Sequence, residues 1–392
     1  MTDAKQRAWS RLPLLSIGLR PFYILGAGFG SGAILRWTLE STDRLERVQT
    51  PSGHAHDMVF GFVGAFIAGF LLTAVANWTN RPTLTGSGLA VLALVWLAAR
   101  VAGLAAGGAL AAALDLIFWL TLLAAVARPI VAARAWRNLP VCGIVLLLGA
   151  LDLLSHLAAA GRWDAVGAAA PVAAAVSVTA VLATLIAGRV IPTFLDRAVG
   201  APLAIRRPWT EHGALASTAS LAVLDVASLG RSIPPGLIAL VAGLATLFHL
   251  ARLVGWRPLR SRNQPLLWSL ALAYAWLPAA FALRASAALG VSSASAATHA
   301  MTIGVLCGLI AAIATRSSRG HTGRPLRADR ADVFLYGLVA AAAGLRVAAE
   351  VWAPGRSGLL LTAGLAFSAG FALFLIRYAA PLIAPRVDEI EG

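Results

Sequence analysis

The sequence predicts an all-α, polytopic membrane protein with about twelve transmembrane helices. Two observations carry this prediction. Of the residues, 59% are hydrophobic and only 12% are charged, whereas soluble proteins carry about 25% charged residues. Long apolar runs also recur along the chain with short connections, and a helix needs roughly 20 apolar residues to cross a bilayer. We therefore expect one integral membrane domain over residues 1–392, surrounded by lipid.

The apolar runs follow one another in a regular order. Glycines dominate the first run, in GAGFGSG, but a dinucleotide-binding loop of that type needs a preceding strand, so we expect these glycines to pack helices. Pro51 breaks the chain before the second run, and Trp37 and Trp78 suit a membrane interface. The predicted helices are 18–39, 54–77, 84–106, 109–131, 138–160, 166–191, 212–230, 233–254, 264–285, 294–316, 332–352 and 357–380.

The basic residues predict the orientation of these helices. The net charge of +15 does not indicate nucleic-acid binding, because the basic residues alternate along the chain and form no single patch. With the N-terminus inside, 23 of the 32 lysines and arginines fall on the inner side. Such a bias favours an even number of helices with both termini in the cytoplasm. The nine basic residues on the outer side are Arg36, Arg44, Arg47, Arg100, Arg162, Arg231, Arg284, Arg346 and Arg356.

The second run, which begins HAHDMVFGF, has a partial copy 243 residues further along the chain. His56 and Met58 correspond to His299 and Met301, and these are the only methionines besides Met1. Both copies continue with small residues at four-residue spacing, which lets helices approach closely. We interpret this as a repeated helix with a histidine near the outer face. Further matches are Gly61 with Gly304, Thr79 with Thr322, Arg81 with Arg324 and Pro82 with Pro325.

Histidines on two membrane helices are suited to hold a haem between them. His56 and His299 occupy the same place in the repeat, and Ala297 stands where a counterpart of His54 would be. We therefore predict His56 and His299 as the axial ligands of one b-type haem. Arginines at similar depth could bind the haem propionates, or they could extend to the lipid headgroups. These candidates are Arg36, Arg100, Arg284 and Arg346. Arg100 or Arg346 could instead pair with Asp115 or Glu350.

A second metal is predicted near the haem, because imidazole also binds copper. Its candidate ligands are His54 and His156, and Asp152 lies one helical turn before His156, where it could orient the imidazole. The alternative for both histidines is a packing or hydrogen-bonding role. The two cysteines, Cys142 and Cys307, fall within apolar runs, so we expect neither a disulfide nor a thiolate cluster.

These motifs resemble the NnrS family of membrane proteins. HAHDMVFGF and AGFLLTAVANWTNRP look like the family's HAHEM, GF and AGFLLTAVPNWTG pattern, and GRVIPTF, THAMTIG and GHTGRPL look like its later motifs in the same order. Asp57 and Ala76 depart from the pattern, which would have Glu and Pro. The resemblance implies haem, copper, a bacterial inner membrane and a role in the response to nitric oxide. More distantly, the two repeated helices resemble the haem-ligating second and tenth helices of haem–copper oxidases and nitric oxide reductases, without the copper-binding histidines of those enzymes.

Three functions are compatible with these features. The first is a haem- and copper-binding protein that mitigates nitric oxide stress by binding nitric oxide or by acting on iron–nitrosyl species. The second is a quinol-linked redox enzyme, such as a nitric oxide reductase or an oxidase. The third is a small-molecule transporter, although transporters often bind their substrates near the membrane midplane and this polar cluster lies closer to the outer face. Whether the protein is an enzyme is left open by the sequence.

Overall fold

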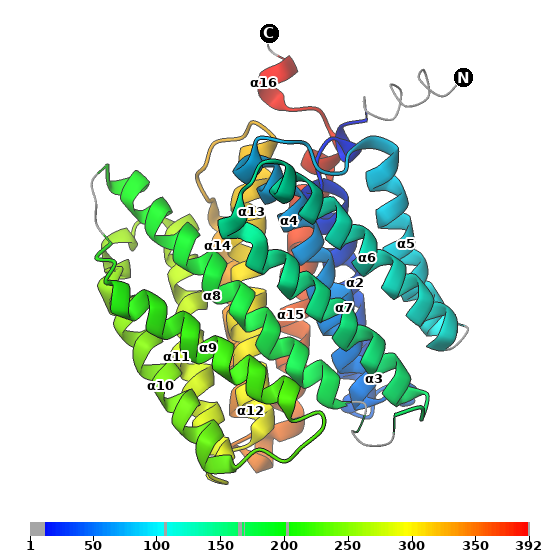
Figure 1. Ribbon diagram of the computed structural model, residues 1–392, viewed down its shortest axis with the longest axis vertical. Helices are drawn as coiled ribbons and strands as arrows, with labels where there is room; N and C mark the ends of the chain where they lie inside the picture. Colours follow the sequence, from blue (N-terminus) through cyan, green and yellow to red (C-terminus); the bar gives the residue numbers. More distant parts are fainter. Residues whose placement is uncertain (1–11, 106–107, 164–166, 168, 201–203, 391–392) are drawn as a thin grey trace.

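The structure is a computed structural model that describes residues 12–390 except 106–107, 164–166, 168 and 201–203. Within these residues the fold is entirely helical, with no strand, which confirms the predicted all-α class. The long helices run up and down between two ends of the molecule (Figure 1). Such an arrangement satisfies every backbone polar group within its own helix, as a lipid environment requires.

Each of the predicted apolar runs overlaps a long helix. The largest difference is in α8, for which the sequence predicts an end at 191 but which continues through Pro192 to Val199. Proline lacks an N–H donor, but the loss of this one hydrogen bond does not end the helix. The helices are α2 Leu19–Ser41, α3 Pro51–His56, η2 Asp57–Val63, α4 Gly64–Thr79, α5 Gly86–Ala105, α6 Gly108–Ala132, α7 Leu139–Ala159, α8 Ala169–Val199, α9 Pro208–Ala227, α10 Pro235–Gly255, α11 Pro265–Ala288, α12 Ala294–His299, η5 Ala300–Cys307, α13 Gly308–His321, α14 Arg330–Ala348, α15 Arg356–Ile383 and α16 Val387–Ile390. Short 3₁₀ turns lie at Pro13–Leu15, Trp136–Asn138, Pro258–Ser261 and Ala353–Gly355.

Ten helical segments in the described part of the chain are long and apolar enough to cross a membrane, so the protein is a multi-pass membrane protein. The two long helices outside this set are α2 and α9, and α9 carries Glu211, His212 and Asp225. The count of twelve spans therefore stays a prediction. On α10, Leu240, Leu244 and Leu247 are exposed, as expected for a helix surrounded by lipid.

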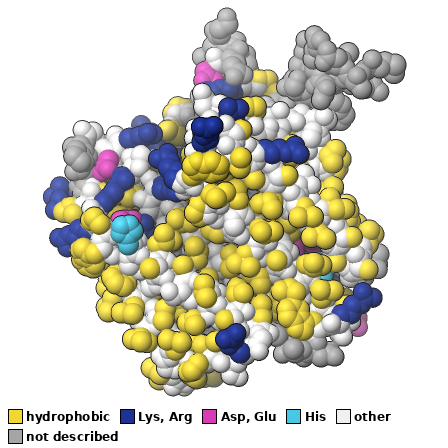
Figure 2. Space-filling model, in the orientation of Figure 1, with side chains coloured by type: hydrophobic (Ala, Val, Ile, Leu, Met, Phe, Trp, Pro, Cys, Tyr) yellow, Lys and Arg dark blue, Asp and Glu magenta, His cyan; other side chains and the backbone are white. Residues whose placement is uncertain are grey.

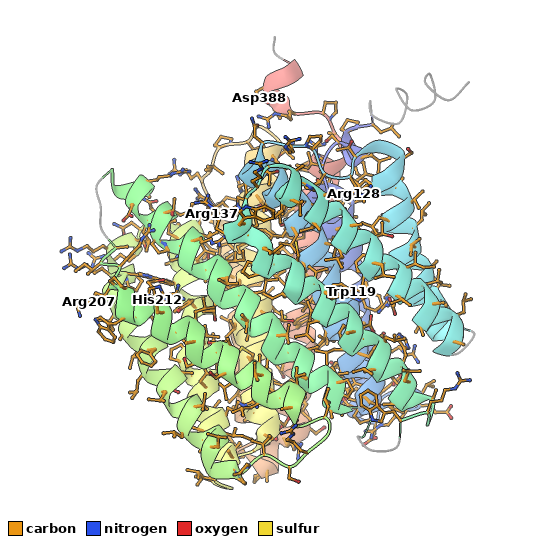
Figure 3. The ribbon with its side chains drawn as sticks, in the orientation of Figure 1. Trp119, Arg128, Arg137, Arg207, His212 and Asp388 are labelled. Carbon is orange, nitrogen blue, oxygen red and sulfur yellow. The ribbon has the colours of Figure 1, made fainter. Side chains whose placement is uncertain are left out.

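The first described residues and α16, which is the last described segment, lie at the same end of the bundle (Figure 1). Most Lys and Arg side chains visible in Figure 2 gather toward this end, above a broad hydrophobic surface. Arg128 and Arg137 also lie in the half of the bundle toward this end, below Asp388 (Figure 3). This distribution agrees with the charge bias of the sequence, although which end faces the cytoplasm stays a prediction. We call the end that carries α16 the inner end, following that prediction.

The two copies of the repeat adopt the same unusual helix. A short α-helix leads to a histidine, a π-helical segment starts at the next residue, and an α-helix follows. The segments α3, η2 and α4 in the first copy thus correspond to α12, η5 and α13 in the second. Even the N-caps match, because Thr50 and Ser293 each accept a backbone N–H within their own first turn. π-Helical turns are rare in proteins, and those that occur are often found at functional sites. Both histidine positions are therefore candidates for function.

Aromatic rings from three helices form the centre of the bundle. Phe62 and Phe66 of the first repeat pack against Phe371 of α15. On α2, a Cβ added at Gly30 would lie 2.1 Å from Cδ2 of Phe62, so the glycine leaves the space that this ring fills. Gly26 and Gly30 of the glycine-rich run therefore pack against the first repeat, as predicted, whereas a Cβ added at Gly32 would have no neighbour within 4 Å. Both cysteines are free and buried, and they pack as small apolar side chains, as predicted.

Candidate metal centre

Four ionisable side chains meet toward the outer end of the bundle. His56 closes α3, Asp115 lies on α6, and Asp152 and His156 lie one turn apart on α7. One ligand atom from each of the four residues lies within 4.8 Å of the others. We call this group the His–Asp centre.

The two imidazoles of the centre point their Nε2 atoms at carboxylates. Nε2 of His56 lies 2.7 Å from Oδ1 of Asp152. Nε2 of His156 lies 3.1 Å from Oδ2 of Asp115 and 3.6 Å from Oδ1 of Asp152. Two nitrogen and two oxygen donors suit a divalent transition metal, and copper(II) binds such donors most tightly in the first-row series. The donor set therefore fits a metal such as copper.

The charge balance of the centre also favours a bound cation. The side chains of Asp115 and Asp152 are only 3% and 1% exposed. Arg100 of α5 is equally buried and pairs with Asp115, which leaves one carboxylate charge to be offset. Because an uncompensated buried charge is strongly destabilising, the remaining charge requires either a protonated imidazole or a metal ion.

Trp119 fixes the orientation of Asp152. Its indole Nε1 donates a hydrogen bond to Oδ2 of Asp152 at 2.7 Å, and the other carboxylate oxygen faces His56. Trp119 follows Asp115 by four residues, so both side chains leave the same face of α6. It lies further from Asp388 than Arg128 and Arg137 do (Figure 3). Residues that hydrogen-bond to a metal ligand, as Trp119 does to Asp152, typically set the orientation of the ligand and the affinity for the metal.

A cavity of about 330 Å³ leads to the His–Asp centre. His56, His156 and Asp115 line this cavity, together with residues 48–50 and 52–53. Within this segment, Gln49 donates to Oδ2 of Asp57 at 2.7 Å, and its backbone N–H donates to Glu40. Small molecules could therefore reach the centre past a segment that is anchored by two hydrogen bonds at Gln49.

The structure separates the two histidines of the HAH motif. The His56 ring faces His156, with ring centroids 4.6 Å apart, whereas the His54 ring stacks flat on Trp37. His54 lies close enough to His299 for their charges to interact. Nδ1 of His299 lies 2.8 Å from the carbonyl oxygen of Ser295, which leaves Nε2 available as a ligand atom. Of the two histidines in the HAH motif, His56 thus faces the His–Asp centre, whereas His54 packs on Trp37.

The four arginines predicted to bind haem propionates all have carboxylate partners within the protein. For Arg100 and Arg346, these ion pairs match the alternative to propionate binding that the sequence left open. The haem-propionate role stays a prediction, and it would require a propionate to share or displace these partners. The pairs are Arg36 with Glu40, Arg100 with Asp115, Arg284 with Asp225 and Arg346 with Glu350.

Two residues of the site were not singled out as ligand or orienting groups from the sequence. Asp115 lies 41 residues from His156, so no local spacing connects them. The available signal was its charge within a membrane helix, which usually marks a site or a pair. Trp119 carried no signal of its own, since a tryptophan in an apolar run is indistinguishable from a packing residue.

The sequence was compared with known protein families and with curated proteins. No curated protein matches the chain. The family model for the NnrS protein matches residues 13–386, a range that includes both π-helical repeats and the His–Asp centre. The chain therefore belongs to the NnrS family.

Proposed function

We propose that this protein acts in the bacterial response to nitric oxide, as an inner-membrane protein whose His–Asp centre holds a transition metal. Copper is the first candidate for this metal. Membership of the NnrS family suggests the nitric oxide response. The observation that carries the metal proposal is the convergence of two imidazoles and two carboxylates within 4.8 Å, beside a cavity open to a small molecule.

The side chains around the centre have distinct roles in this proposal. His56, His156, Asp115 and Asp152 would hold the metal, and Arg100 would offset the charge of Asp115. When the metal binds, the two imidazoles act as neutral ligands and release any proton they carry. The hydrogen bond from Trp119 would keep one Asp152 oxygen directed at the metal. Nitric oxide, a small neutral diatomic molecule, would approach through the cavity.

We further propose that a haem is held at the outer ends of the two repeated helices. Bound haem supplies a redox-active iron that binds nitric oxide. His299 is the first candidate ligand, because its Nδ1 is anchored on Ser295. For the second ligand, His54 fits better than His56, because Nε2 of His56 already faces Asp152. The original pairing of His56 with His299 remains as the alternative.

Purification of the full-length protein with metal analysis and an absorption spectrum tests this proposal. We expect stoichiometric transition metal, a haem spectrum, and a spectral change on addition of nitric oxide. Turnover of nitric oxide with reduced quinol would move the assignment to a redox enzyme. A purified, folded protein that takes up neither metal nor haem when both are supplied would contradict the proposal and favour a transporter.

A further inference from the structure

A second polar cavity lies near the inner end of the bundle, remote from the His–Asp centre. It has a volume of about 510 Å³ and lies between α2, α4, α8 and α13. Its lining includes the basic side chains of Arg197, Arg316, His321 and Arg386, and none of its described lining residues is acidic. The charge of Arg386 is already offset by Asp388. The basic character of the cavity therefore rests mainly on Arg316 and Arg197.

Arg316 differs from the other buried arginines of the bundle. Its guanidinium lies over the ring of Phe194, with Cζ 3.9 Å from the ring centroid. Among the described residues it forms no ion pair with a carboxylate, whereas Arg319, one turn further along α13, pairs with Asp332. Arg197 lies close enough to Arg316 for the two charges to repel. A partly buried cation with a like charge beside it is a favourable position for an anion.

An apolar slot continues from this cavity into the bundle. The slot, of about 80 Å³, shares Tyr23, Phe70 and Ile313 with the basic cavity. It runs between the two repeated helices and α8, and its remaining lining is apolar except for Thr179. Apolar cavities of this kind stay dry and accept hydrocarbon. The combined shape has a cationic mouth and a hydrocarbon-lined interior.

We propose that these two cavities together bind an anionic phospholipid, with its phosphate at Arg316 and part of an acyl chain in the apolar slot. A guanidinium binds phosphate oxygens through charge-assisted hydrogen bonds. The hydroxyl of Tyr23, at the junction of the cavities, lies 3.4 Å from Oγ of Ser317, and it places a polar group between the cationic mouth and the apolar slot. The site does not depend on the metal centre or on the response to nitric oxide.

The test uses the delipidated full-length protein in a neutral detergent, with phosphatidylglycerol as the probe. Native mass spectrometry and thermal melting measure binding. Phosphatidylglycerol should bind at least tenfold more tightly than phosphatidylcholine, and Arg316→Gln should remove roughly a tenfold preference, or about 1.4 kcal/mol. Arg327→Gln makes the same charge change on an exposed connection at the same end, and it should leave binding unchanged.

A second variant distinguishes a lipid from a free anion. Ile310→Trp places a larger side chain in the apolar slot, which Ile310 lines. We expect it to weaken phosphatidylglycerol binding without affecting any weak binding of inorganic phosphate at Arg316. Inorganic phosphate that competes as well as the lipid, together with an inert Ile310→Trp, would show a free-anion site and overturn the proposal. Equal binding of a neutral quinone, insensitive to Arg316→Gln, would overturn it as well.

Discussion

Nε2 of His56 lies 2.7 Å from Oδ1 of Asp152, although the two residues are 96 positions apart in the chain. The contact joins the first repeated helix to α7 and completes a donor set that neither helix could form alone. It also decides which histidine of the HAH motif belongs to the His–Asp centre. The predictions below follow from this assignment and from the ion pairs around it.

Removing either imidazole of the centre should release the metal. We expect His56→Ala and His156→Ala each to lower the affinity for copper at least tenfold, because each removes one of four donors. Metal content per folded protein, measured by mass spectrometry, checks this. His212→Ala, on an exposed position of α9, is the matched control. Full copper in both variants would reduce the centre to a hydrogen-bonded network.

Removing the cation beside Asp115 should destabilise the fold. In Arg100→Gln the buried carboxylate loses its ion-pair partner, at a cost of about 3–5 kcal/mol. The double variant Arg100→Gln/Asp115→Asn removes both charges and should recover most of the lost stability. Thermal melting in detergent compares the two variants. A double variant no more stable than Arg100→Gln would mean that the pair is not the source of the effect.

The haem ligands can be identified by spectroscopy. We expect His299→Ala and His54→Ala to abolish or deeply reduce the haem spectrum, and His56→Ala to affect mainly the copper content. His321→Ala, at the inner end, should leave both unchanged. A loss of haem in His56→Ala with an intact His54→Ala would instead restore the pairing predicted from the repeat. A bis-histidine spectrum retained in His299→Ala would exclude either pairing.

The connection between α14 and α15 should make stability depend on acidic pH. Burial raises the pKa of Glu350, but hydrogen bonds from Arg346 and Ser293 and the Arg346 charge outweigh it and hold the pKa at about 2, below the ordinary 4.5. A lowered folded-state pKa adds stability above the unfolded value, and this contribution is lost as the pH falls from 4.5 toward 2. We expect the melting temperature of the wild type to fall more steeply over this interval than that of Glu350→Gln. The exposed Glu46→Gln should follow the wild type, and parallel curves for Glu350→Gln would contradict the assignment.

Topology can be checked by reporter fusions. The charge bias predicts that fusions at Arg44 and Arg356 report the periplasmic side and that a fusion at Arg260 reports the cytoplasmic side. A periplasmic signal at Arg260 would invert the outer position given to the His–Asp centre.

The positions of the helices could be predicted from the sequence because hydrophobicity depends only on local composition. The contacts of the histidines could not. His54 and His56 point about 200° apart on a regular helix, so one of them must face away from a given neighbour. Which one does so depends on the rotation of the helix, and the packing of distant aromatic rings such as Phe62 against Phe371 sets that rotation. The pairing of Asp115 with His156 is likewise a tertiary contact without a local pattern.

The π-helical segments have a consequence for how the two histidines are aimed. A π-helical turn contains one residue more than an α-helical turn, and one residue corresponds to about 100° of rotation. Each segment lies between a histidine on its N-terminal side and an α-helix on its C-terminal side. The face that carries the imidazole is therefore rotated relative to the face that packs in the bundle. A shift of the wide turn by one position would re-aim a histidine while the helix below it kept its neighbours.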